Sequence, residues 1–79
     1  MKIDFDFFLI LLKEQFIEET GELSLGTNFR MLPSWDSMTG MTILLMIEEN
    51  FNLKIDSEQF KKLTTIENLY NYIIENSNL

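Results

Sequence analysis

Apolar side chains recur along this chain at steps of three and four residues, and no stretch alternates apolar and polar residues as a half-buried strand does. The first segment places Phe5, Leu12 and Phe16 at such steps, with charged residues on much of the remaining surface. This spacing predicts an amphipathic helix over residues 2–19 and an all-α fold for the chain.

A second helix is predicted from Ser37 to Asn50. Its apolar residues cover more than one face, which exceeds what a half-buried helix needs. Three surrounding helices could bury this whole surface, or part of it could meet a partner protein. The residues alone leave both interpretations open.

Two shorter helices follow, and each is marked by a pair with capping-box spacing. In such a pair a cap side chain accepts a hydrogen bond from an early helical amide, and a Glu or Gln three residues on returns one. The pairs are Asp56 with Gln59 and Thr64 with Glu67. They predict helices that begin near Ser57 and Thr65.

The predicted fold is one domain over residues 1–79, a four-helix bundle with a long loop between the first two helices and a short third helix. A chain of 79 residues that is 46% hydrophobic can build one core without disulfides. The long loop is predicted between Gly21 and Trp35, because Gly26, Asn28 and Pro33 interrupt any regular element there.

Charge and missing residue types argue against several functions. Six Lys and Arg against thirteen Asp and Glu give a formal net charge of -7, which disfavours nucleic acid as a partner. Without Cys or His the usual nucleophile, general base and metal ligands are lacking, so we expect no metal site and no catalysis by the chain itself. The apolar run from Phe7 to Leu12 is too short for a membrane span, so we expect a cytoplasmic protein without membrane insertion.

The sequence Trp35-Asp36-Ser37-Met38 lies at the predicted junction of the long loop and the second helix. A serine here would present its hydroxyl outside the bundle, where the first-turn amides and the helix dipole favour an attached anionic group. Asp and Ser are also ordinary helix caps, so the dipeptide by itself predicts a cap more readily than an attachment site.

The dipeptide belongs to a longer series of residues that covers more than half of the chain and whose spacing has no gaps from Asp36 onward. They are Phe29, Asp36-Ser37-Met38, Glu48-Glu49 with Phe51, Ile55, Thr64-Thr65-Ile66 and Tyr72-Ile73. In this series the chain resembles the acyl carrier protein family, in which the serine of Asp-Ser-Leu carries 4'-phosphopantetheine.

The resemblance implies a carrier function. Ser37 would hold the 4'-phosphopantetheine arm, brought from coenzyme A by a phosphopantetheinyl transferase, and Asp36 would be its recognition neighbour. The arm supplies the thiol that a chain without Cys lacks. We expect a monomeric acyl carrier that presents thioester intermediates to acyl-transferring enzymes, ketosynthases or ligases in fatty acid or polyketide-type biosynthesis.

The resemblance also implies a partner surface on the second helix and an acyl pocket between this helix and the two short ones. The candidate partner residues are Met38, Met41, Leu45, Glu48 and Glu49. The candidate pocket residues are Leu44, Ile47, Ile55, Phe60 and Leu63, for which simple core packing is the alternative.

Several positions depart from the family pattern. Thr39 and Thr42 stand where many members carry acids that contact basic enzymes, so a basic partner would meet hydroxyls there. Met38 replaces the usual Leu, and the family's Gly before the serine is replaced by the surroundings of Trp35. Gly40 lies inside the helix, where it costs about 1 kcal/mol relative to Ala unless it permits a close backbone approach. These departures suggest a specialised or auxiliary carrier.

Two other functions remain open. The same arm serves amino acids, so a D-alanyl or peptidyl carrier is an alternative. The chain could also be an unmodified helical adaptor that binds partners through Met38, Met41 and Leu45. A mass unchanged after co-expression with a broad-specificity transferase would favour the adaptor.

Overall fold

The computed structural model describes residues 3–77 of the chain. Within them the helices are α1 (Phe5–Lys13), the short 3-10 helix η1 (Phe29–Met31), α2 (Ser37–Phe51), α3 (Ser57–Lys61) and α4 (Ile66–Asn76). The described part contains no strand, only one isolated antiparallel bridge between Asn28 and Thr65. The prediction of an all-α fold with four helices, a long loop and a short third helix is therefore confirmed.

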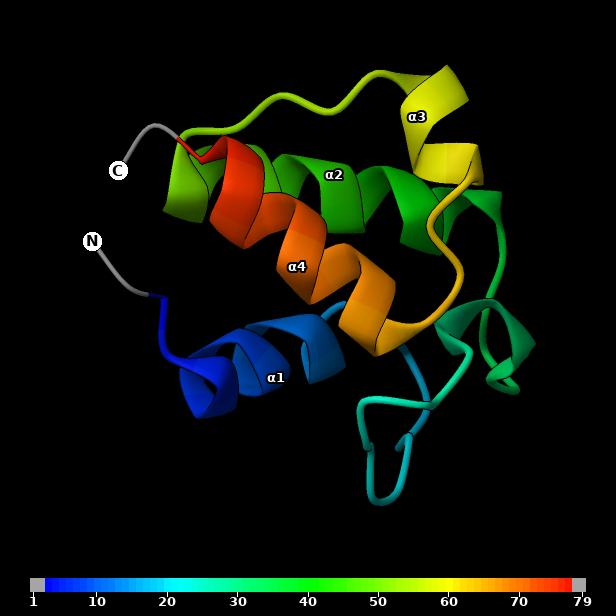
Figure 1. The fold of residues 1–79 in the computed structure, drawn as a ribbon. Helices are drawn as coiled ribbons and strands as arrows, with labels where there is room; N and C mark the ends of the chain where they lie inside the picture. Colours follow the sequence, from blue (N-terminus) through cyan, green and yellow to red (C-terminus); the bar gives the residue numbers. More distant parts are fainter. Residues whose placement is uncertain (1–2, 78–79) are drawn as a thin grey trace.

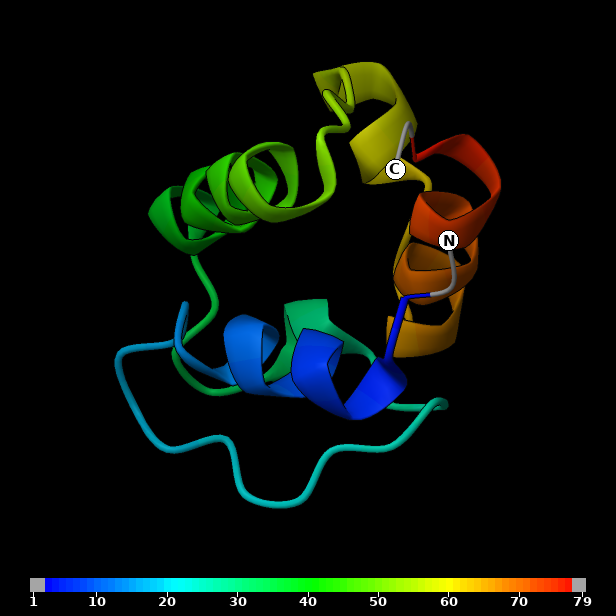
Figure 2. The ribbon, with the colours of Figure 1, turned by 90° about the vertical axis from the view of Figure 1, so that its left-hand side faces the viewer.

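Three of the helices enclose the core, and the fourth closes one end of it. Figure 2 shows α1, α2 and α4 around a common centre. The short α3 lies beside the half of α2 that begins at Ser37 (Figure 1). This arrangement leaves the start of α2 between α3 and the long loop.

The first helix is shorter than the predicted range of 2–19. It ends at Lys13, and Lys2 lies outside the described residues. The amide of Phe16 donates to the Lys13 carbonyl at 3.2 Å, a three-residue step that tightens the chain after the helix. Phe16 is nevertheless buried and lies 6.5 Å from Trp35 between ring centroids. The apolar spacing thus identified a buried residue correctly but not the end of the helix.

The last helix begins with a different capping pair from the predicted one. Thr65 accepts a hydrogen bond from the Asn68 amide at 3.1 Å, and the Asn68 side chain accepts one from the Thr65 amide at 3.3 Å. The predicted pair of Thr64 and Glu67 is wrong by one position, because Asn performs the returning role here in place of Glu. The predicted start of α3 near Ser57 is confirmed, and the Asp56 carboxylate accepts the Gln59 amide at 2.8 Å, but Gln59 does not make the returning bond that Asn68 makes at α4.

The long loop is held against the start of α4 by backbone hydrogen bonds. The amides of Ile66 and Glu67 donate to the carbonyls of Thr27 and Leu25 at 3.0 and 2.9 Å. These first-turn amides have no partner within their own helix, so the loop supplies the missing acceptors. The loop thereby becomes an ordered part of the bundle.

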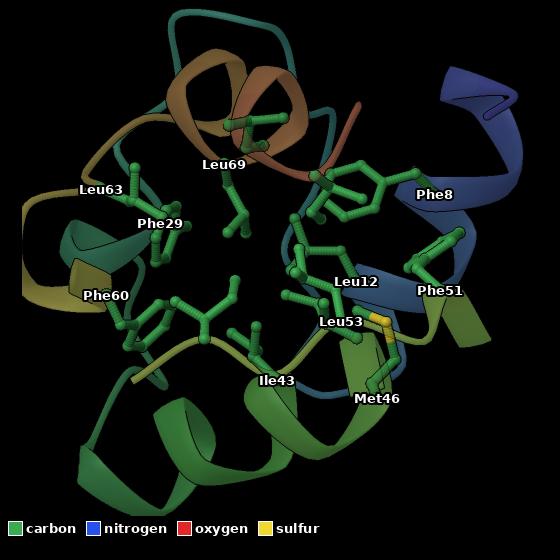
Figure 3. Packing of buried hydrophobic residues seen from close by; sticks show 14 of the residues in the cluster. Phe8, Leu12, Phe29, Ile43, Met46, Phe51, Leu53, Phe60, Leu63 and Leu69 are labelled. Carbon is green, nitrogen blue, oxygen red and sulfur yellow. The ribbon is translucent and has the colours of Figure 1, made fainter. Parts of the chain in front are cut away.

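One apolar core joins all four helices and the loop (Figure 3). The side chains that are wholly inaccessible to solvent come from every one of these helices except α3, which contributes Phe60 at 6% exposure. The largest fully buried side chains are Phe8, Leu12, Phe29, Ile43, Ile47, Ile66, Leu69 and Ile73.

Candidate functional site

The start of α2 is built around the Asp36 carboxylate. Asp36 has an extended backbone, and its Oδ1 accepts the Thr39 amide at 2.7 Å. The Thr39 hydroxyl donates to the same oxygen at 2.8 Å, and the Asp36 carbonyl accepts the Gly40 amide at 3.1 Å. Asp36 is thus an N-cap that satisfies the early amides of a 15-residue helix.

These bonds also fix the charge of the cap. Hydrogen bonds from the Thr39 amide and hydroxyl hold the pKa of the Asp36 carboxyl below its ordinary value, because they favour the ionised form. Asp36 is exposed, so water screens its charge. The carboxylate is therefore ionised at neutral pH immediately before the candidate serine.

Ser37 is the first residue of α2 and is exposed. Its hydroxyl makes no hydrogen bond with another residue of the described part. It can be reached by a modifying enzyme, and an anionic group on it would lie near the positive end of the α2 dipole. The position fits a phosphodiester attached through the Ser37 oxygen.

Thr39 does not face a partner, contrary to the expectation from its family position. It is only 4% exposed, and its hydroxyl is engaged by Asp36 and, at 3.3 Å, by the Ser34 carbonyl. Thr42 is half-buried, and its hydroxyl donates to the Thr39 carbonyl at 2.9 Å. Thr39 therefore supports the cap, and only Thr42 is partly available to a docking protein.

The candidate partner residues lie on the outer side of α2. Met38, Met41 and Leu45 are exposed by 71, 65 and 56%, so the second helix leaves a substantial apolar surface uncovered. Glu48 and Glu49 are also exposed. The surrounding helices therefore do not bury the whole apolar surface of α2, and the part that stays exposed is available to a partner protein.

Two hollows continue this surface toward α1. One of about 100 Å³ is lined by Asp36, Met38, Thr39, Thr42, Gln15 and Ile17. The other, of about 360 Å³, is lined by Leu11, Glu14, Gln15, Thr42, Leu45, Met46, Glu49 and Asn50. Because Gln15 and Thr42 border both, the hollows are adjacent. Sequence reasoning missed the contribution of residues 14–17, since it placed them within a straight helix.

The five candidate pocket residues belong to the core. Ile47, Ile55, Phe60 and Leu63 are between 0 and 7% exposed, and Leu44 is partly buried against them. The structure thus brings the predicted set together, but as packed side chains. This agrees with the core-packing alternative.

A second Asp-Ser pair, Asp56 and Ser57, begins α3 and was predicted from the sequence only as a helix start. Asp56 caps α3 through the Gln59 amide, and Ser57 is the exposed first residue of that helix. Its local geometry resembles that of Ser37, but α3 has five residues against fifteen in α2. The short helix offers a weaker dipole, and the pair provides an internal comparison for any claim about Ser37.

Other kinds of site find little support in the described part of the chain. No three His, Cys, Asp or Glu side chains there are grouped closely enough to bind a metal ion. None of the helices over residues 3–77 has the length and apolar character that a bilayer crossing requires.

When the chain is compared with models of known protein families, one family model matches most of the bundle. The family model described as a phosphopantetheine attachment site matches residues 11–73, a range that contains α2, α3 and the first eight of the eleven residues of α4. None of the curated proteins compared with the chain matches it.

Proposed function

Because the chain belongs to the acyl carrier protein family of phosphopantetheine-carrying proteins, we propose that Ser37 is its attachment residue. In this proposal the modified protein holds acyl intermediates as thioesters and presents them to partner enzymes of fatty acid or polyketide-type biosynthesis. Members of this family bind 4'-phosphopantetheine covalently and receive it from transferases.

The observation that carries the proposal is the free Ser37 hydroxyl at the start of the longest helix. It lies within the matched range and combines exposure with a helix terminus that favours an anion. Ser57 shares the Asp neighbour and the exposure, but it begins a helix of only five residues. The two serines therefore differ mainly in the element that follows them.

The residues around Ser37 have separate tasks in this proposal. Asp36 and Thr39 keep the first turn of α2 in place and hold a negative charge beside the hydroxyl. That charge can orient a basic group of the transferase. When attached, the arm supplies the thiol that forms the thioester, since the chain has no Cys.

Docking of partner enzymes is assigned to the outer surface of α2. Met38, Met41 and Leu45 supply exposed apolar contacts there, and Glu48 and Glu49 add negative charge further along the helix. Exposed Met side chains adapt to several binding partners. With a net charge of -7, the chain suits enzymes with a basic face in the cytoplasm. Catalysis belongs to those enzymes, and this chain acts as a monomeric carrier.

Intact-mass measurement tests the attachment. The wild type, Ser37→Ala and Ser57→Ala are each incubated with coenzyme A and a broad-specificity phosphopantetheinyl transferase. We expect the mass of one phosphopantetheine on the wild type and on Ser57→Ala, and none on Ser37→Ala. Equal modification of the two variants would refute Ser37 as the attachment residue.

A further inference from the structure

The rings of Trp35 and Phe60 both lie against Gly40, one helical turn from Ser37. A Cβ atom at Gly40 would lie 3.1 Å from Trp35 Cη2 and 3.5 Å from Phe60 Cε2. Trp35 precedes α2 and Phe60 belongs to α3. The two rings therefore close the seam between α2 and α3 on the side where the arm would be attached.

A third ring supports these two from inside the bundle. Phe29 is fully buried, and its ring centroid lies 5.7 Å from that of Trp35 and 6.1 Å from that of Phe60. Figure 3 shows Phe29 and Phe60 together at one end of the core. Trp35 and Phe60 thus pack on a fixed partner and cannot move apart without losing these contacts.

Arg30 ties the same rings to the end of α3. Its Cζ lies 4.6 Å from the Phe60 ring centroid, 5.2 Å from that of Trp35 and 5.3 Å from that of Phe29. Its Nε donates to the Leu63 carbonyl at 3.0 Å, and its Nη2 donates to the Phe60 carbonyl. A planar guanidinium with several donors can make all of these contacts at once. Opening the seam would break them together.

We propose that this aromatic closure, formed by Trp35 and Phe60 over Gly40 with Phe29 and Arg30 behind them, keeps cargo out of the core. The inference rests on the proposed attachment of the arm to Ser37. Phe60 is itself one of the candidate pocket residues; of the other four, Ile47, Ile55 and Leu63 are packed in the core, and Leu44 is partly buried against it. A long aliphatic chain would therefore remain in water, which is unfavourable in proportion to its apolar surface. The cargo class that fits is a short acyl group, such as a short hydroxyacyl group, which within the proposed function favours polyketide-type intermediates over long fatty acyl chains.

Loading with acyl groups of different length tests the closure in the wild type. A broad-specificity transferase attaches acetyl-, octanoyl- or dodecanoyl-phosphopantetheine from the matching coenzyme A thioester. Trp35 is the only tryptophan, so its emission maximum and its quenching by acrylamide report directly on the closure. We expect both to be the same for all three acyl groups, and the thioesters to be cleaved by hydroxylamine at equal rates. Slower cleavage of the dodecanoyl form, with altered Trp35 fluorescence, would overturn the inference.

Two variants test whether the aromatic closure is what keeps a long acyl chain out of the core. We expect Trp35→Ala and Phe60→Leu to admit the dodecanoyl chain and to slow its cleavage relative to acetyl. A chain buried between half and nine-tenths of the time would be cleaved roughly two- to tenfold more slowly. The control is Phe7→Ala, which removes an aromatic ring that is 47% exposed on α1, and it should show no such effect.

The outcomes separate the two claims. If the proposed function is wrong, the wild-type protein gains no mass on incubation with the transferase and the coenzyme A thioesters. Correctly loaded variants that fold by circular dichroism but show no dependence on chain length would overturn the role of the closure. Should Trp35→Ala fail to fold, Phe60→Leu keeps an apolar side chain at its position and decides the question.

Discussion

The Thr39 side chain and the Asp36 carboxylate form a two-point contact at the start of α2, with the Thr39 amide and hydroxyl both donating to Oδ1 at 2.7 and 2.8 Å. Thr39 stands at a position where many members of the family carry an acid, and here its side chain stabilises the cap instead. Ser37 lies between these two residues, so the contact fixes the backbone on both sides of the candidate attachment residue.

We expect Thr39→Val to weaken this contact without changing the packing volume. Val keeps the amide bond to Asp36 but lacks the hydroxyl, so the free energy of unfolding should fall by about 0.5–1.5 kcal/mol. Thr42→Val, which removes a hydroxyl bonded within the helix, should have a smaller effect. Urea unfolding of both variants gives the comparison. An equal or larger loss in Thr42→Val would show that the Thr39 hydroxyl is not important for the cap.

The cap should also make stability depend on pH. The pKa of Asp36 is lower in the folded chain, so its stabilisation is fully present above the unfolded pKa of about 3.9 and is lost as pH falls through the folded value. Asp36→Asn retains a capping oxygen that does not titrate. The difference in unfolding free energy between wild type and Asp36→Asn should be constant above about pH 5 and shrink below about pH 4. A difference that stays constant throughout acid unfolding would contradict this.

Gly40→Ala should destabilise the protein although Ala favours helix. The propensity gain of about 1 kcal/mol is opposed by overpacking of roughly 1–3 kcal/mol, because the new Cβ would lie 3.1 Å from a Trp35 ring that is held on several sides. Gly26→Ala is the control, since a Cβ there meets nothing within 4 Å. Thermal unfolding and Trp35 fluorescence measure the result. A Gly40→Ala protein more stable than wild type would mean that Trp35 moves away easily.

We expect partner recognition to depend more on the exposed Met side chains than on acids. Met41→Ala should slow loading by a phosphopantetheinyl transferase more than Glu48→Gln does, because apolar anchors prolong a complex whereas rim charges mainly affect encounter. Both side chains are exposed on α2, so neither change should unfold the protein. Loading rates across a salt series test this. A larger loss in Glu48→Gln, with steep salt dependence, would indicate that recognition is mainly electrostatic.

Helical spacing and caps predicted most of the fold. The start of α2 at Ser37 and the start of α3 at Ser57 are local properties, because an Asp before each helix accepts an amide three residues on. The end of α1 is not local: Phe16 continues the apolar spacing, but the chain turns after Lys13 and Phe16 packs near Trp35. Spacing alone cannot distinguish a buried helical residue from a buried residue in a turn.

The site was predictable to a similar extent. The place of Ser37 follows from the cap pattern and the family resemblance, and the structure adds its exposure and free hydroxyl. The burial of Thr39 and the approach of Trp35 and Phe60 to Gly40 depend on how α3 and the loop pack, which a single sequence does not encode locally. Gly40 was the available signal, since a glycine inside a helix can mark a close approach.

Localising the modification within the wild-type chain tests the central claim most directly. The protein is loaded with coenzyme A and a transferase, digested, and its peptides are fragmented in the mass spectrometer so that the phosphodiester is assigned to one residue. We predict that the whole modification lies on Ser37, with Ser34 and Ser57 unmodified. A modification on Ser57, or an unmodified Ser37 in a fully loaded sample, would contradict the account.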